Sequence, residues 1–176
     1  MKSFSVKLLL VILFLTSFLS SVQAQETCAW TKTSANIALN LRLGMTTAEV
    51  NAALGGKPKI KNKTRGEYRF FQNYIDDKPP AKLRNVRALY VRFFDGQLYQ
   101  AEIFYDESFS PSLENFAALI AQQYSFSLTD FKAEKTKLIV RCGENTLAAD
   151  DVLNPRIELT NEPILEKTNK LNEAKK

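Results

Sequence analysis

Asp95 and Gly96 separate two apolar segments, and this dipeptide constrains the fold more than any other feature of the chain. The flanking segments, Val86–Phe94 and Gln97–Tyr105, are rich in the β-branched and aromatic residues typical of strands. Asp-Gly between two such segments is the strongest short signal for a two-residue hairpin turn. The sequence therefore predicts an antiparallel β-hairpin over these residues.

The register of this hairpin depends on one extra residue. An uninterrupted ladder would place Gln100 and Glu102 beside Leu89 and Val91, on the face that packs against the core. An additional residue in the second strand returns the two polar side chains to the opposite face. We therefore predict a β-bulge at Tyr99–Gln100.

A short helix is predicted upstream, because both of its ends carry signals. Thr46 and Glu49 have the spacing of a capping box. Gly55 allows the left-handed turn that ends many helices, and Pro58 prevents continuation. These residues predict a helix over Thr47–Leu54.

Another short helix is predicted before it. Thr33 and Ser34 can cap this helix, and Ile37 and Leu41 recur at helical spacing before Gly44. The two helices would form an N-terminal helical pair that packs on the sheet.

The rest of the chain predicts a further helix and several strands. Ser110 and Pro111 have the pattern of a cap followed by a first-turn proline, and apolar residues then repeat at helical spacing up to Tyr124. Strands are expected at Tyr68–Ile75, Lys137–Cys142 and Arg156–Thr160, with a short extra strand at Thr146–Ala148 left open. The predicted fold class is α+β, with an N-terminal helical pair packed on an antiparallel β-sheet, a further helix and C-terminal strands.

The first residues have the organisation of a secretory signal peptide. Lys2 and Lys7 precede the apolar segment Leu8–Leu19, and Val22 and Ala24 fit a small-x-small cleavage site. The apolar segment is shorter than the roughly 20 residues of a membrane anchor, which favours its removal. We expect a periplasmic or secreted protein with no stable membrane span after cleavage. The predicted organisation is a signal peptide at 1–24, a single α+β domain at 25–162, and a charged tail at 163–176 that is a frayed helix or disordered.

The chain has two cysteines, Cys28 and Cys142. In an oxidising compartment such a pair most simply forms a disulfide, which here would close a loop of roughly 110 residues. Two alternatives remain open, namely two free thiols or a lipid on Cys28. Lipidation requires a cysteine directly after the cleavage point, whereas residues 25–27 intervene here.

The composition argues against most familiar chemistries. The chain has no histidine, which removes the commonest general base and the usual zinc ligands. No phosphate-binding glycine motif occurs either. From these absences together we predict no catalytic residue, no metal and no cofactor. The adjacent acids at Asp76-Asp77 and Asp150-Asp151 are more typical of turns and solvated charges than of a carboxylate enzyme. The formal net charge of +5 is spread along the chain and does not indicate nucleic-acid binding.

The side of the hairpin that faces away from the core is a candidate binding surface. It carries aromatic residues mixed with arginine, a composition typical of interface hot spots. Alternatively, the helix at 111–124 or another segment covers this face and makes it a second core layer. The candidate residues are Tyr90, Arg92, Phe94, Glu102 and Phe104.

Two short motifs resemble those of a known superfamily. Leu43–Pro58 is similar to its G-M-T-x-x-E-V…L-G-x-P opening, and Phe93–Leu98 resembles its F-x-[DN]-G-x-L hairpin. This superfamily contains the outer-membrane assembly lipoproteins (SmpA/OmlA, or BamE-like) and the β-lactamase inhibitory protein, and the match covers roughly residues 34–105. The resemblance implies two helices packed on an antiparallel sheet and a role in protein binding in the envelope rather than in catalysis. The chain lacks the lipobox cysteine of the lipoproteins and has one copy of the unit instead of the inhibitor's tandem pair.

Together these features predict an exported, non-catalytic protein-binding domain of the cell envelope, with an envelope protein as its partner. Two other classes remain as alternatives. A small envelope hydrolase that uses carboxylates would bring acids together with displaced pKa values. A carrier of a lipid or small apolar molecule would contain an apolar cavity.

Overall fold

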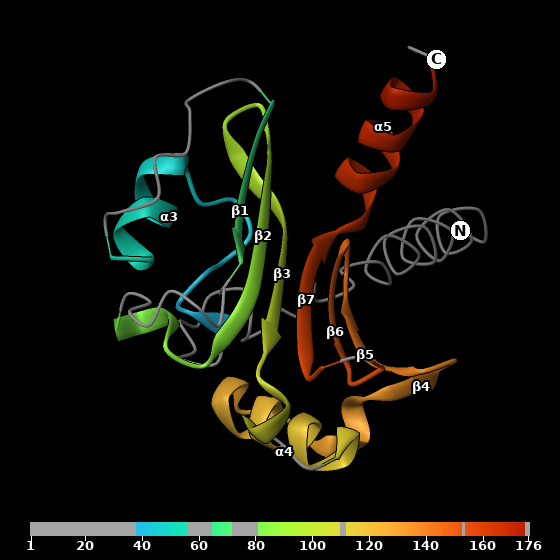
Figure 1. Ribbon diagram of the computed structural model, residues 1–176. Helices are drawn as coiled ribbons and strands as arrows, with labels where there is room; N and C mark the ends of the chain where they lie inside the picture. The colour runs from blue at the N-terminus through green and yellow to red at the C-terminus, as the bar shows by residue number, and fades with distance from the viewer. Residues whose placement is uncertain (1–37, 56–64, 72–80, 110–111, 153, 175–176) are drawn as a thin grey trace, which may run out of the picture.

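A computed structural model describes residues 38–55, 65–71, 81–109, 112–152 and 154–174, which form one seven-stranded antiparallel sheet with helices against it (Figure 1). The strand order is β1-β2-β3-β7-β6-β5-β4. The strands are β1 Arg65–Phe71, β2 Val86–Phe94, β3 Gln97–Tyr105, β4 Lys132–Glu134, β5 Lys137–Cys142, β6 Asn145–Asp150 and β7 Arg156–Asn161. The α-helices of this part of the chain are α3 Thr47–Ala53, α4 Leu113–Tyr124 and α5 Glu162–Glu173, with short 3-10 turns η2 Ala81–Leu83, η3 Glu107–Phe109 and η4 Leu128–Asp130.

The central hairpin forms as the sequence predicts. Asp95 and Gly96 have φ values of 49° and 76°, and a type I′ turn requires positive φ at both of its central residues. β2 and β3 therefore pair directly on either side of this dipeptide.

The predicted β-bulge is confirmed. Phe93 pairs with Leu98, but Arg92 pairs with Gln100, so that Tyr99 is the extra residue in β3. The bulge restores the alternation of apolar and polar side chains on the strand beyond it.

One face of the sheet holds the core. α3 and α4 both pack on this face, and α4 contributes the fully buried Phe116, Ile120 and Tyr124. The sheet residues of this core are Val86, Leu89, Val91, Phe93, Leu98, Ala101, Ile103, Tyr105, Leu147, Ala149, Ile157 and Leu159.

The capping box at the start of α3 is present. The backbone N–H of Thr46 donates to the Glu49 carboxylate at 2.7 Å, and the backbone N–H of Glu49 donates to Thr46 Oγ1 at 3.3 Å. The bond from the Thr46 backbone lowers the pKa of the Glu49 carboxyl. The cap fixes the start of α3 directly after Thr46, which forms a β-bridge with Gln97 of β3.

The predicted N-terminal helical pair is wrong, because the described residues before α3 form turns. Leu39 and Asn40 have φ values of 56° and 59°, and two successive left-handed residues cannot continue a right-handed helix. The backbone N–H of Gly44 instead donates to the carbonyl of Leu98 at 2.8 Å, which attaches this segment to the hairpin. Residues 33–37 of the predicted first helix lie outside the described residues.

The C-terminal segment forms α5, where the sequence predicts a frayed helix or a disordered tail. Asn161 caps this helix by accepting a hydrogen bond from the backbone N–H of Ile164 at 3.2 Å, and Pro163 lies in its first turn. Thr168 is buried and donates to the carbonyl of Leu165 at 2.9 Å. Within the described part of the chain, no helix is long and apolar enough to cross a membrane.

We predict that Thr46→Ala destabilises the protein, because it removes the hydroxyl that caps α3. The free energy of unfolding should fall by about 1 kcal/mol in urea denaturation. Thr46→Ser keeps a capping hydroxyl and should lie within about 0.5 kcal/mol of the wild type. Equal losses in both variants would contradict a role for the cap.

Candidate binding face

The side of the sheet opposite the core is polar, and we refer to it as the outward face. Its members alternate with core residues along each strand, so the register of the ladders decides which side chains meet. The face extends over six neighbouring strands, in the spatial order β1, β2, β3, β7, β6 and β5. Its described side chains include Arg65, Glu67, Tyr90, Arg92, Phe94, Gln100, Glu102, Phe104, Arg156, Glu158, Thr160, Thr146, Asp150, Lys137 and Arg141.

Four of the five candidate residues form two contacting pairs on this face. Tyr90 and Phe104 are half-buried and meet edge to face, with ring centroids 5.9 Å apart. Arg92 donates to Glu102 at 2.8 Å. The structure thus brings together an aromatic pair and an ion pair on β2 and β3.

Phe94 is the exception, because its side chain is 9% exposed. The Lys167 ammonium lies 4.8 Å from the ring centroid, and the Arg65 guanidinium lies 5.5 Å from it. Lys167 belongs to α5, so this end of the outward face is covered by the C-terminal helix. α4, which the sequence offered as a possible cover, packs on the core side.

A continuous series of ion pairs crosses the outward face, and we call it the charge ladder. Arg92 lies 3.3 Å from Glu67 and 2.8 Å from Glu102. Glu102 also lies 3.4 Å from Arg156, whose Nε donates to Asp150 at 2.9 Å. The ladder alternates in sign and joins β1, β2, β3, β7 and β6.

A branch of the ladder reaches β5. Gln100 accepts a hydrogen bond from Arg92 and donates to Glu158 at 3.0 Å, and Lys137 donates to Glu158 at 2.8 Å. Burial alone would raise the pKa of the Glu158 carboxyl, but the ammonium of Lys137, the guanidinium of Arg156 and the amide of Gln100 outweigh it and lower this pKa. Glu158 is therefore held as a carboxylate.

Three acids of the outward face form ion pairs. Glu102 faces Arg92, Asp150 faces Arg156, and Glu158 faces Lys137. Among the described residues, no group of three or more possible ligands could hold a metal ion.

The paired acids of the sequence separate in the structure. Asp150 is buried and bonds to Arg156, whereas Asp151 is exposed. Asp76 and Asp77 lie outside the described residues.

Sequence reasoning missed the β7 side of the face, namely Arg156 and Glu158. The alternation of Ile157 and Leu159 already implies that these two charges point away from the core. Their place beside Glu102 depends on the pairing of β3 with β7, which no local signal indicates.

Cys142 lies at the end of β5 and is disulfide-bonded. Cys28, the other cysteine of the chain, lies outside the described residues. The pairing of the two stays a prediction.

Comparison of the chain with known protein families, with curated proteins and with solved structures finds no match. The resemblance to the superfamily of assembly lipoproteins and the β-lactamase inhibitory protein therefore stays a prediction.

We predict that Glu158→Gln lowers the free energy of unfolding at pH 7 by about 1–2 kcal/mol, because it removes a charge-assisted bond at a side chain that is 17% exposed. The folded pKa of Glu158 lies below its ordinary value of 4.5, so its contribution is complete above that pH. The contribution is lost as the pH falls through the lowered pKa. Urea denaturation from pH 7 to pH 3 should show the two proteins converge.

Glu144→Gln provides the control, because Glu144 is an exposed glutamate in the β5–β6 turn. It should change the free energy of unfolding little at any pH. A constant difference between wild type and Glu158→Gln down to pH 3 would contradict the proposed ionic origin.

Proposed function

We propose that this protein is an exported, non-catalytic domain of the cell envelope that binds another protein through the outward face of its sheet. The observation that carries this proposal is the half-exposed cluster of Tyr90, Phe104 and Arg156. The Arg156 guanidinium lies 5.2 Å from the centroid of the Phe104 ring, next to the edge-to-face pair of Tyr90 and Phe104. Tyrosine and arginine are the residue types enriched in the hot spots of protein interfaces.

The charge ladder supports specific rather than nonspecific binding of a partner. Side chains that are already held by cross-strand bonds lose little conformational freedom when a partner binds, which reduces the entropic cost of association. Among the described residues, Arg92 donates through its Nε and one terminal nitrogen only, whereas a guanidinium has five N–H groups. A partner that presents carboxylates around an apolar centre would fit this face.

The rigid backbone beneath the cluster strengthens the proposal. Tyr90 and Phe104 lie on β2 and β3, both of which have a partner strand on each side. Binding residues on paired strands hold their positions better than residues on loops.

We predict that Tyr90→Ala/Phe104→Ala weakens partner binding at least tenfold, because loss of a hot-spot side chain costs about 2 kcal/mol or more. The experiment is affinity capture from the native envelope with the wild-type protein as bait, followed by titration of the captured protein against both variants. The matched control is Leu128→Ala/Val152→Ala, which removes two apolar side chains that are 51% and 62% exposed elsewhere on the surface.

The control variant should bind as the wild type does. A partner retained equally by the Tyr90→Ala/Phe104→Ala variant would place the binding site on another surface. Failure of the wild-type protein to retain any partner would overturn the proposal itself.

Export and the disulfide give a separate prediction. Protein isolated from the envelope should begin at Gln25, because the signal peptide has been removed. Alkylation should add no mass before reduction and two adducts after it, at Cys28 and Cys142. Intact-mass spectrometry decides both points, and a chain that retains residues 1–24 or alkylates without reduction contradicts them.

A further inference from the structure

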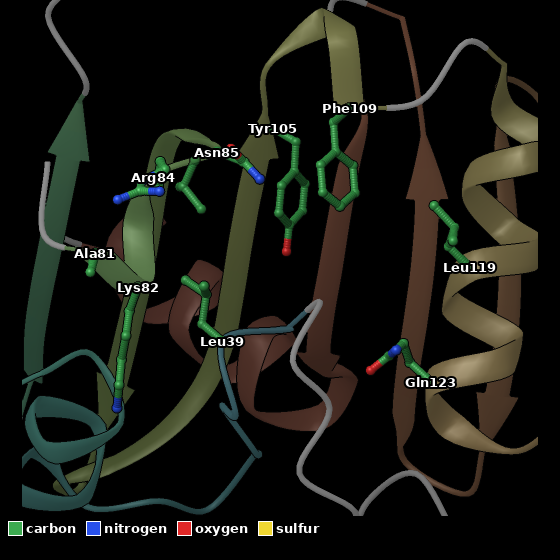
Figure 2. A pocket seen from close by; sticks show the side chains of 10 residues that line it. Leu39, Ala81, Lys82, Arg84, Asn85, Tyr105, Phe109, Leu119 and Gln123 are labelled. Atoms are coloured by element: carbon green, nitrogen blue, oxygen red, sulfur yellow. The ribbon is translucent and has the colours of Figure 1, made fainter.

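A cavity of about 280 Å³ lies on the core side of the sheet, away from the outward face. It is formed by η2, the beginning of β2, the end of β3 and α4 (Figure 2). Its apolar walls include Leu39, Val86, Phe109 and Leu119. An apolar cavity of about 150 Å³ already holds a benzene-sized molecule, so this one has room for a larger monocyclic compound.

The inner wall of the cavity is aromatic. Tyr105 and Phe109 stack with ring centroids 4.4 Å apart and planes 20° apart, and Figure 2 shows the two rings side by side. Phe116 meets Tyr105 edge to face at 5.9 Å. Tyr105 is thus held in one orientation by its neighbours.

The Tyr105 hydroxyl is an unusual feature of this wall. The residue is 3% exposed, and its hydroxyl oxygen has no hydrogen-bond partner among the described residues. Burial and the nearby Tyr124 raise the pKa of the Tyr105 hydroxyl, which keeps it protonated and able to donate. Buried polar groups are nearly always hydrogen-bonded in native proteins, so this donor lacks an acceptor that a ligand could supply.

The mouth of the cavity is formed by α4 and η2. Leu119 is 39% exposed there, and Gln123 points from α4 toward the cavity (Figure 2). The side chains of Lys82 and Arg84 are directed away from the Tyr105 hydroxyl, and Lys82 donates to the carbonyl of Ala53 at 3.1 Å. The cavity therefore offers apolar contact, the Tyr105 hydroxyl and the neutral amides of Asn85 and Gln123, while the two cationic side chains that line it point away from that hydroxyl.

We propose that this cavity binds a small, neutral, mainly apolar molecule with a single hydrogen-bond acceptor, such as a ketone or an ester, which accepts from the Tyr105 hydroxyl. The apolar walls and the stacked rings would contact the apolar part of the ligand, and the Tyr105 hydroxyl would donate to its acceptor. This site is independent of the proposed protein-binding face, because it lies on the other side of the sheet.

The test uses two probes of nearly the same shape, acetophenone and α-methylstyrene. Acetophenone has a carbonyl oxygen where α-methylstyrene has a methylene group. Titration of the mature, disulfide-intact protein by two-dimensional NMR should show shifts at Tyr105, Phe109 and Leu119. The wild type should bind acetophenone about fivefold more tightly than α-methylstyrene, because only the ketone accepts a hydrogen bond. Tyr105→Phe should abolish this preference while it retains the ring.

Tyr90→Phe is the matched control, because it removes a tyrosine hydroxyl from the outward face and should leave the preference intact. Leu119→Trp fills the mouth of the cavity and should abolish binding of both probes. The proposal is overturned if neither probe binds up to its solubility limit, if Tyr105→Phe keeps the preference, or if Leu119→Trp binds as the wild type does. None of these outcomes bears on partner capture by the outward face.

Discussion

The extra residue at Tyr99 decides which side chains of the central hairpin meet the core and which lie on the outward face. Because Arg92 pairs with Gln100 beyond the bulge, Glu102 lies opposite Tyr90 rather than opposite Leu89. Without the bulge, a carboxylate would point into an apolar layer, and an unpaired buried charge is among the most unfavourable groups in a protein. The charge ladder, the aromatic pair and the core on the other side therefore all depend on this one irregularity.

β7 then extends the arrangement across the sheet. It is the C-terminal strand of the sheet, yet it lies between β3 and β6, so Arg156 bonds to Glu102, 54 residues earlier in the chain, and also to Asp150. The core supplies most of the stability, and the partly buried ion pairs of Arg156 add to it only as far as their attraction exceeds the cost of desolvation. The ladder also specifies register, because a one-residue slip of β7 would turn Arg156 and Glu158 into the core and remove Arg156 from Glu102.

Local signals predicted the hairpin, its bulge and the capping box of α3, because each depends on residues within a few positions of one another. The helical pair failed because Leu39 and Asn40 adopt left-handed conformations without a glycine that would mark them. The C-terminal helix did carry a signal, since Asn161 followed by Pro163 is a cap with a first-turn proline. The β7 side of the candidate face could not be predicted, because it requires a pairing between distant strands.

The two proposed sites meet in β3, where successive side chains point to opposite faces. Phe104 belongs to the aromatic pair of the outward face, and Tyr105, the next residue, lines the cavity. A ligand bonded to Tyr105 therefore acts on the same strand that positions Phe104. That strand is hydrogen-bonded to β2 and to β7, so it resists displacement, and interior packing leaves little room for a partial shift. The geometry consequently favours two sites that work side by side on a rigid sheet over a switch that couples them.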